Sequence, residues 1–284
     1  MTTAPLLRDF SIEVTPRSLR ETPDIAKWLP RGTTVYIAHI AGTPIDDMVH
    51  AARRLRDLGF EPQPHLPARV IPSRAVFDTL LQRYTGEAGV RRALLLGGGP
   101  AAPAGPFDSA NQLLDGGVFD RLGFTHLHFA GHPEGSPDLD PNGGTATADS
   151  ALLTKHAFAQ RTDARVALVT QFVFDAQPVI NWSQRIAAMG IDVPIHVGVA
   201  GPAHAAILLR YGLACGIGPS LQVLRKRARD IRRFIWPMKP DAIVADLARH
   251  VAAHPASQIA QLHLFPLGGI KPAAKWAAGH IAQG

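Results

Sequence analysis

The sequence predicts a single-domain (βα)8 TIM barrel. Eight short apolar runs alternate with amphipathic segments along the chain, and this alternation is typical of parallel βαβ units. The 284 residues are close to the about 250 that one such barrel needs, and no change in composition divides them. We therefore expect one catalytic domain over residues 1–284, with its site at the carboxyl ends of the strands.

Four strands are expected in the first half of the chain, at Phe10–Thr15, Thr33–Ile40, Glu61–Pro67 and Arg92–Gly97. The third is the weakest, because a proline cannot donate a backbone N–H to a sheet. Helical patterns lie between them, at Ser18–Leu29, Pro44–Leu58 and Ser73–Tyr84. In the second of these, apolar residues recur on one side. Gly59 is expected to end that helix, and Ser73 to cap the next one.

The second half continues the alternation. Strands are expected at His126–Ala130, Val166–Phe174, Pro194–Val199 and Ile259–Leu267. The strand at Val166–Phe174 has the clearest pattern, since it is almost continuously apolar. Helices are expected at Ser109–Leu122, Thr147–Gln160, Pro178–Met189, His204–Ala214, Ser220–Ile235 and Asp241–Ala253, and after the last strand.

The amino-acid composition excludes several classes of protein. The single cysteine, Cys215, excludes an internal disulfide and a cysteine-based metal cluster. No signal peptide is evident, and no apolar run reaches the ~18 residues of a membrane span. We expect a cytoplasmic protein that does not bind membranes.

The formal charge of +6 is concentrated in one basic stretch, Arg225–Arg233. Such a run is usually a solvated helix face, although a phosphate, polyglutamate or subunit contact stays open, as does homo-oligomerisation. Aromatic residues do not alternate with the basic ones, so we do not expect a nucleic-acid partner.

Polar residues and glycines gather where the predicted strands end. They are Glu13, His39, His65, Gly97–Gly99, His132, Glu134 and Gln171. Glu13 interrupts an apolar strand, which suggests a partly desolvated carboxylic acid with a raised pKa that donates a proton. The alternative is that Glu13 pairs with a buried cation or lies at a solvated strand end.

Other motifs at the strand ends are less specific. Gln171 suits the edge of a pterin or flavin ring, or is a satisfied core amide. The turn Gly97–Gly99 suits a phosphate or a flat ring, or is only a tight turn. The histidines lack the spacing of a metal site, and no Gly-x-Ser-x-Gly motif indicates a serine hydrolase.

Four of these segments together resemble the methylenetetrahydrofolate reductase family, a family of flavin-binding barrels. They are Ser11-Ile12-Glu13-Val14-Thr15-Pro16, Pro64-His65-Leu66, His132-Pro133-Glu134 and Thr170-Gln171-Phe172-Val173-Phe174-Asp175. They fall in the family's order and on the matching strands. The last of them is the most specific.

The resemblance implies an oxidoreductase that interconverts 5,10-methylenetetrahydrofolate and 5-methyltetrahydrofolate with FAD, and with NADH or NADPH as electron donor. Glu13 matches the general acid. The implied folate contacts are Gln171, Phe172 and Lys271, the last as a substitute for an arginine. The implied flavin contacts are His39, His65, Gly97, Gly98, Gly99, Ser109, His132, Glu134 and Lys155.

Some positions depart from the family pattern. The family's Arg-Gly-Asp after strand four is Gly97-Gly98-Gly99 here, so the carboxylate beside the flavin is missing, and the basic residues before strand six are reduced to Lys155 and His156. Two other functions therefore stay open: a flavin-free barrel that passes a methyl group from a pterin, and a non-catalytic folate- or flavin-binding protein.

Overall fold

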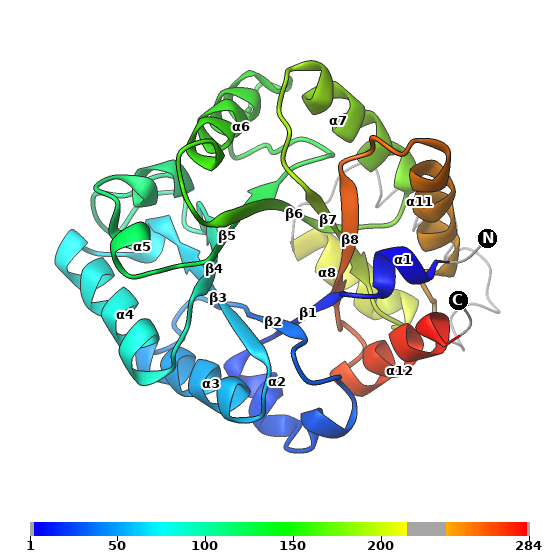
Figure 1. Cartoon of the computed structure of the whole chain (residues 1–284), viewed down its shortest axis with the longest axis horizontal. Coiled ribbons are helices and arrows are strands. Elements are labelled where there is room, and N and C mark those ends of the chain that lie inside the picture. The colour runs from blue at the N-terminus through cyan, green and yellow to red at the C-terminus, as the bar shows by residue number, and fades with distance from the viewer. Residues whose placement is uncertain (1–2, 215–236, 283–284) are drawn as a thin grey trace.

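The computed structural model describes residues 3–214 and 237–282. Eight parallel strands close into a barrel in sequence order, which confirms the predicted fold (Figure 1). The strands are β1 (Ser11–Val14), β2 (Thr34–Ile37), β3 (Glu61–Pro67), β4 (Arg92–Leu96), β5 (His126–Gly131), β6 (Arg165–Val173), β7 (Ile195–Ala200) and β8 (Ile259–Phe265).

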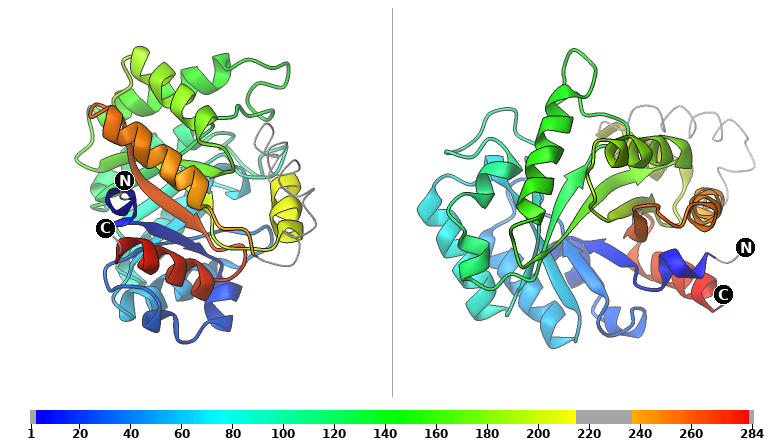
Figure 2. Two further views of the ribbon diagram at one scale, coloured as in Figure 1. Left: turned by 90° about the vertical axis from the view of Figure 1, so that its right-hand side faces the viewer. Right: turned by 45° about the horizontal axis from the view of Figure 1, so that its top comes forward.

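Helices surround the barrel, as two further views show (Figure 2). They are α1 (Ala4–Leu7), α2 (Pro16–Glu21), α3 (Ile45–Asp57), α4 (Arg74–Glu87), α5 (Val118–Arg121), α6 (Ala146–Ala159), α7 (Ala176–Ala188), α8 (Ala205–Ala214), α11 (Asp241–Ala253) and α12 (Ile270–Ile281). Short 3-10 helices are η1 (Ile25–Lys27), η2 (Ala68–Val70) and η3 (Ala110–Leu114). Helix α1, which the sequence pattern did not predict, packs beside β8 and α12.

Two predicted helices are each divided in the structure. The segment Ser18–Leu29 forms α2 and η1, with Pro23 between them, where a proline cannot continue the backbone hydrogen bonds of a helix. The segment Ser109–Leu122 forms η3 and α5. Gly116 and Gly117 lie between these two with φ angles of +83° and +64°, a left-handed conformation that ends a helix. The predicted helix Ser220–Ile235, with its basic stretch, lies outside the described residues.

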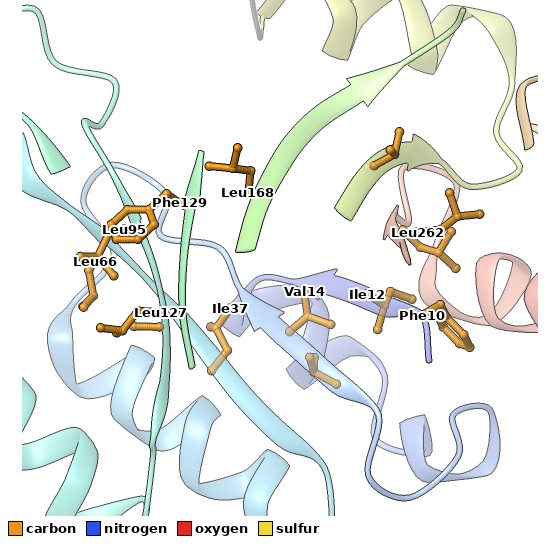
Figure 3. Close-up of a cluster of buried hydrophobic side chains, with 14 of the residues drawn as sticks. Phe10, Ile12, Val14, Ile37, Leu66, Leu95, Leu127, Phe129, Leu168 and Leu262 are labelled. Atoms are coloured by element: carbon orange, nitrogen blue, oxygen red, sulfur yellow. The ribbon is translucent and has the colours of Figure 1, made fainter. Parts of the chain in front are cut away.

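The main core lies between the strands and the surrounding helices. Outward-facing strand residues such as Ile12, Val14 and Leu262 are almost fully buried there, and Figure 3 shows several of these side chains on neighbouring strands. Alternate residues of each strand point into the barrel. The apolar alternation therefore directs Glu13, between Ile12 and Val14, to the inside.

Helix boundaries follow from local chemistry. The hydroxyl of Ser73 accepts a hydrogen bond from the N–H of Val76 at the start of α4, as predicted. Gly59, with φ +83°, follows α3, and its N–H donates to the carbonyl oxygen of Arg56. Thr15 caps α2 directly after β1. This cap fixes the point at which the chain leaves the barrel, two residues beyond Glu13.

Candidate functional site

Glu13 lies near the carboxyl end of β1 and faces two histidines from other strands. Its Oε2 is 3.2 Å from Nε2 of His65 on β3 and 3.8 Å from Nε2 of His263 on β8. The Glu13 side chain is 19% exposed, whereas that of His263 is 1% exposed. The carboxylate therefore lies at the edge between the barrel interior and the carboxyl-end mouth, with one imidazole at the mouth and one beneath it.

The expected rise in the pKa of Glu13 is wrong. Burial alone raises the pKa of this carboxyl group, but the adjacent imidazoles of His263 and His65 outweigh burial and lower the pKa to about 2. The structure therefore favours the alternative in which Glu13 is paired inside the barrel, here with two imidazoles. At neutral pH the group is a carboxylate, and a proton that it donates must first reach it from a neighbour.

His39 interacts electrostatically with His65. His39 follows β2 and is partly buried. Burial lowers its pKa, and the charge of His65 lowers it further.

The glycine turn after β4 leaves its backbone accessible. Gly98 has φ +106°, which an L side chain rarely adopts, and a Cβ there would lie 3.2 Å from Cβ of Pro67. A Cβ at Gly97 or Gly99 would meet no atom within 4 Å. This turn is therefore open to a flat group that approaches the backbone.

Arg69 fixes this turn and the neighbouring long loops, a role that the sequence did not reveal. Its N–H donates to the carbonyl oxygen of Gly97 at 2.9 Å. Its buried guanidinium donates to Asp108 at 2.8 Å and to Asp138 at 2.9 Å. Because the guanidinium also donates to the carbonyl oxygen of Pro100, the loops at residues 97–106 and 133–144, which follow different strands, share one cation. A single arginine between two prolines carries no recognisable motif, since its partners are distant in sequence.

We expect Arg69→Met to loosen both loops. The substitution keeps an apolar stem but removes the cation that links Asp108 and Asp138, so it should lower the free energy of unfolding by about 1–3 kcal/mol. Limited proteinase K digestion followed by mass spectrometry should show faster cleavage in the two loops. Arg83→Met is the matched control, because Arg83 pairs with Asp46 and Glu87 far more openly. Equal cleavage of both variants would contradict this role of Arg69.

A second set of residues implied to contact a flavin lies after β5 and on α6. Burial, together with the charge of Lys155, lowers the pKa of His132 to about 4. Lys155 on α6 is buried, and its Nζ donates to the carbonyl oxygen of Ala130 at 3.1 Å. Burial lowers the pKa of Lys155 to about 8. Glu134 is partly buried.

Ser109 begins η3, where its N–H donates to Oε1 of Gln112 at 3.1 Å.

A bulge in β6 exposes Gln171. The register between β6 and β7 shifts between Val169 and Phe172, and a bulge of this kind re-aims side chains next to active sites. Gln171 is exposed near the carboxyl end of the strand, so the alternative of a satisfied core amide is wrong. Phe172, by contrast, is 2% exposed and packs against Phe265.

Lys271 lies on the outside of the barrel. Its Nζ is 4.3 Å from the centroid of the Trp28 ring, which packs against the core between strands and helices. The structure therefore does not place it with Glu13 and His65, and its predicted contact with folate is not supported. The prediction followed from its position shortly after β8, but α12 turns the side chain outward.

The barrel interior contains a set of polar residues that sequence reasoning missed. Ser11, Tyr36, Gln63, His128 and His263 are all buried. The sequence did contain a signal for these interior positions, since His128 alternates with the outward-facing apolar residues of β5, as His263 does on β8. Burial lowers the pKa of His128 and His263 and lowers that of His196 to about 4.

The low pKa values of these histidines should make the folded state less stable in acid. A histidine whose pKa is lower in the folded than in the unfolded state binds fewer protons when folded, so stability is lost as pH falls below about 6.5. The Glu13 contribution is lost only below its unfolded value, 4.5. Urea unfolding should therefore give a free energy at pH 4.5 that is lower than at pH 7 by at least about 2 kcal/mol. His196→Asn should reduce this difference; equal stability at both pH values would contradict the neutral state of these histidines.

Two further findings concern the described residues. No group of three or more histidine, cysteine, aspartate or glutamate side chains among them is arranged to hold a metal ion. Within the same residues, no helix combines the length and the apolar character that crossing a membrane requires.

The sequence is similar to methylenetetrahydrofolate reductase 2 of Saccharomyces cerevisiae, with 30% identity over 173 residues. The match covers 58% of this chain but only 27% of the yeast protein. No model of a known protein family matches the chain. These numbers confirm the resemblance as a distant homology.

The fold is also similar to a solved structure from Clostridium thermocellum, with a TM-score of 0.62, 13% identity and complete coverage of both chains. That structure is described as an uncharacterized protein that binds two copies of 5-methyl-5,6,7,8-tetrahydrofolic acid. At this identity, the likeness supports the barrel fold.

Proposed function

We propose that this distant relative of the methylenetetrahydrofolate reductases binds a tetrahydrofolate at the carboxyl end of its barrel and interconverts 5,10-methylenetetrahydrofolate and 5-methyltetrahydrofolate. The observation that carries the proposal is the Glu13 carboxylate beside His65 at the barrel mouth. The position of Glu13 matches the family's acid, and the exposed amide of Gln171 lies at the same end of the barrel. The Clostridium thermocellum barrel, which binds 5-methyltetrahydrofolic acid, is consistent with this ligand class.

FAD is the proposed cofactor, and two features of the chain fit it. The open backbone of Gly97–Gly99 would face the flat ring. Among residues 3–214 and 237–282, Lys155 has a backbone carbonyl as its hydrogen-bond partner and forms no ion pair, so its charge would suit the diphosphate. When bound, the flavin would supply the hydride, with NADH or NADPH as electron donor. The turn contributes no carboxylate to tune the flavin potential.

In this mechanism, side chains of the protein transfer one proton to the substrate. Opening the five-membered ring of methylenetetrahydrofolate requires a proton on its bridging nitrogen, and the Glu13 carboxyl group would deliver it. Because Glu13 is ionised, its Oε2 would first receive a proton from an adjacent imidazole, that of His65 at 3.2 Å or that of His263 at 3.8 Å. After delivery, the carboxylate charge would stabilise the cation that ring opening creates. Gln171 would hold the pterin edge through its amide.

The test uses the purified full chain. We expect 5-methyltetrahydrofolate to bind in isothermal titration calorimetry, and visible flavin bands near one equivalent to persist after FAD addition and desalting. Anaerobic NADH or NADPH should then bleach the flavin, and methylenetetrahydrofolate should restore its colour. Absence of folate binding would overturn the proposal. Folate binding without retained FAD would instead favour the flavin-free methyl-pterin function.

A further inference from the structure

The interior of the barrel is polar where apolar packing is usual. The inward-facing residues of such barrels are mostly valine, isoleucine and leucine. Here Ser11, Tyr36, Gln63 and His263 are completely buried, and His128 is 5% exposed. Burying polar groups costs free energy unless they are hydrogen-bonded, so this composition calls for an explanation other than packing.

These side chains form a chain of hydrogen bonds and close contacts that begins at Glu13. Nε2 of His263 is 3.8 Å from the Glu13 carboxylate, and its Nδ1 is 2.9 Å from Oγ of Ser11. The Tyr36 ring packs on His263 with centroids 4.4 Å apart, and hydrogen bonding to Ser11 partly offsets the rise that burial causes in the Tyr36 pKa. The Tyr36 hydroxyl is also hydrogen-bonded to Nδ1 of His128.

This chain of contacts continues from His128 toward the amino-terminal end of the barrel. The His128 ring lies 4.9 Å from that of His196 and 6.3 Å from that of His126. His126 is the first residue of β5, and His196 is the second residue of β7, so both lie toward the amino-terminal end. His126 is partly exposed there. The sequence of groups therefore extends from the mouth of the barrel to its amino-terminal face.

Each member can both accept and donate a proton. Serine and tyrosine hydroxyls have this property, and a neutral imidazole has one N–H donor and one nitrogen acceptor, whereas a protonated imidazole has only donors. Burial, followed by the charges of Arg92 and Arg165, lowers the pKa of His126 to about 4. With His128, His196 and His263 shifted in the same direction, the histidines of this set are neutral near pH 7.

Three buried atoms of the interior have no hydrogen-bond partner among the described residues: Nε2 of His263, Nδ1 of His196 and Oε1 of Gln63. An unsatisfied buried polar atom costs about 1–3 kcal/mol. Polar sites of this kind commonly bind ordered water, and a water between Nε2 of His263 and Glu13 would bridge their 3.8 Å separation.

We propose that Ser11, Tyr36, His128 and His263 form a proton relay that connects Glu13 with the amino-terminal face of the barrel. The relay rests on the proposed function, in which bound folate and flavin cover the mouth and obstruct proton exchange there. One proton enters from solvent on the His126 and His196 side. Each group accepts a proton on one atom and releases one from another, and the net result is one proton on the Glu13 carboxylate. No oxidant or reductant takes part.

Nitrogen-15 NMR of the histidine side chains tests the relay without catalysis. Glu13→Gln removes the proton acceptor at one end, so we expect the imidazole resonances of both His263 and His128 to move. In a Tyr36→Phe background, which keeps the ring but removes the hydroxyl that links Ser11 with His128, Glu13→Gln should move the His263 resonances but not those of His128. If Glu13→Gln leaves His128 unchanged in the otherwise native chain, the relay is wrong, whatever the activity of the protein.

Kinetics provide a second test. Tyr36→Phe should lower kcat by about tenfold or more and raise the solvent deuterium isotope effect, while the Kd for folate stays unchanged. Tyr84→Phe is the matched control, since Tyr84 is an equally buried tyrosine in the outer core, and should change neither. Unchanged kcat and isotope effect in Tyr36→Phe would overturn the relay. Folate binding without turnover in the native protein would refute the proposed reaction, while NMR still decides the relay.

Discussion

Replacing Glu13 with glutamine is expected to lower turnover of methylenetetrahydrofolate by about 10²- to 10⁴-fold, with folate still bound. The amide fills the same volume but can neither receive a proton from an adjacent imidazole nor carry the negative charge that stabilises a cation at the mouth. Single-turnover flavin reoxidation by methylenetetrahydrofolate should therefore become slow, whereas flavin reduction by NADH or NADPH, which does not require this proton, should keep its rate.

The control for this variant is Glu87→Gln, an isosteric change at an exposed glutamate of α4 that pairs with Arg83. It should retain native kinetics. Thermal unfolding of both variants would show whether Glu13→Gln acts through lost stability. If reoxidation stays fast in a folded Glu13→Gln protein, another group supplies the proton, and His65 would be the next candidate.

The sequence predicted the barrel because local patterns determine it. The strand Glu61–Pro67 was predicted with its correct bounds despite three prolines, since its neighbours in the alternation fixed its place. The divided helices show where apolar periodicity alone is insufficient. Periodicity over 109–122 suggests one helix, but Gly116 and Gly117 adopt left-handed conformations that separate η3 from α5.

The candidate site was only partly predictable, because its electrostatics depend on residues that are distant in the chain. Glu13 was identified as an anomaly in its strand, but the direction of its pKa shift depends on His65 and His263, which reach it from β3 and β8. The contact of Lys271 with Trp28 likewise depends on how α12 lies against η1.

The bulge that exposes Gln171 also gives Gly198 a specific role, and Gly198→Ala is expected to weaken folate binding by about tenfold or more, or at least about 1.4 kcal/mol. A Cβ at this position would lie 2.5 Å from the carbonyl oxygens of both Thr170 and Gln171. These are backbone atoms that cannot rotate away. The added methyl group would therefore push β6 from β7 and displace Gln171, with a loss of about 1–3 kcal/mol in the free energy of unfolding.

The hydroxyl of Thr170 shows why the effect should be concentrated at Gln171. It accepts a hydrogen bond from the N–H of Gly198 at 2.9 Å and donates one to the carbonyl oxygen of Gln171 at 2.7 Å. A displacement of the Gly198 backbone would therefore also displace the bulge at Gln171. Calorimetric titration with 5-methyltetrahydrofolate and urea unfolding measure the two effects. Gln171→Ala should weaken binding without the loss of stability, and Gly86→Ala, where a Cβ meets no atom within 4 Å, should change neither unfavourably. If Gly198→Ala keeps native affinity and native stability, β6 and β7 can separate without moving Gln171. The bulge would then have no role in folate binding.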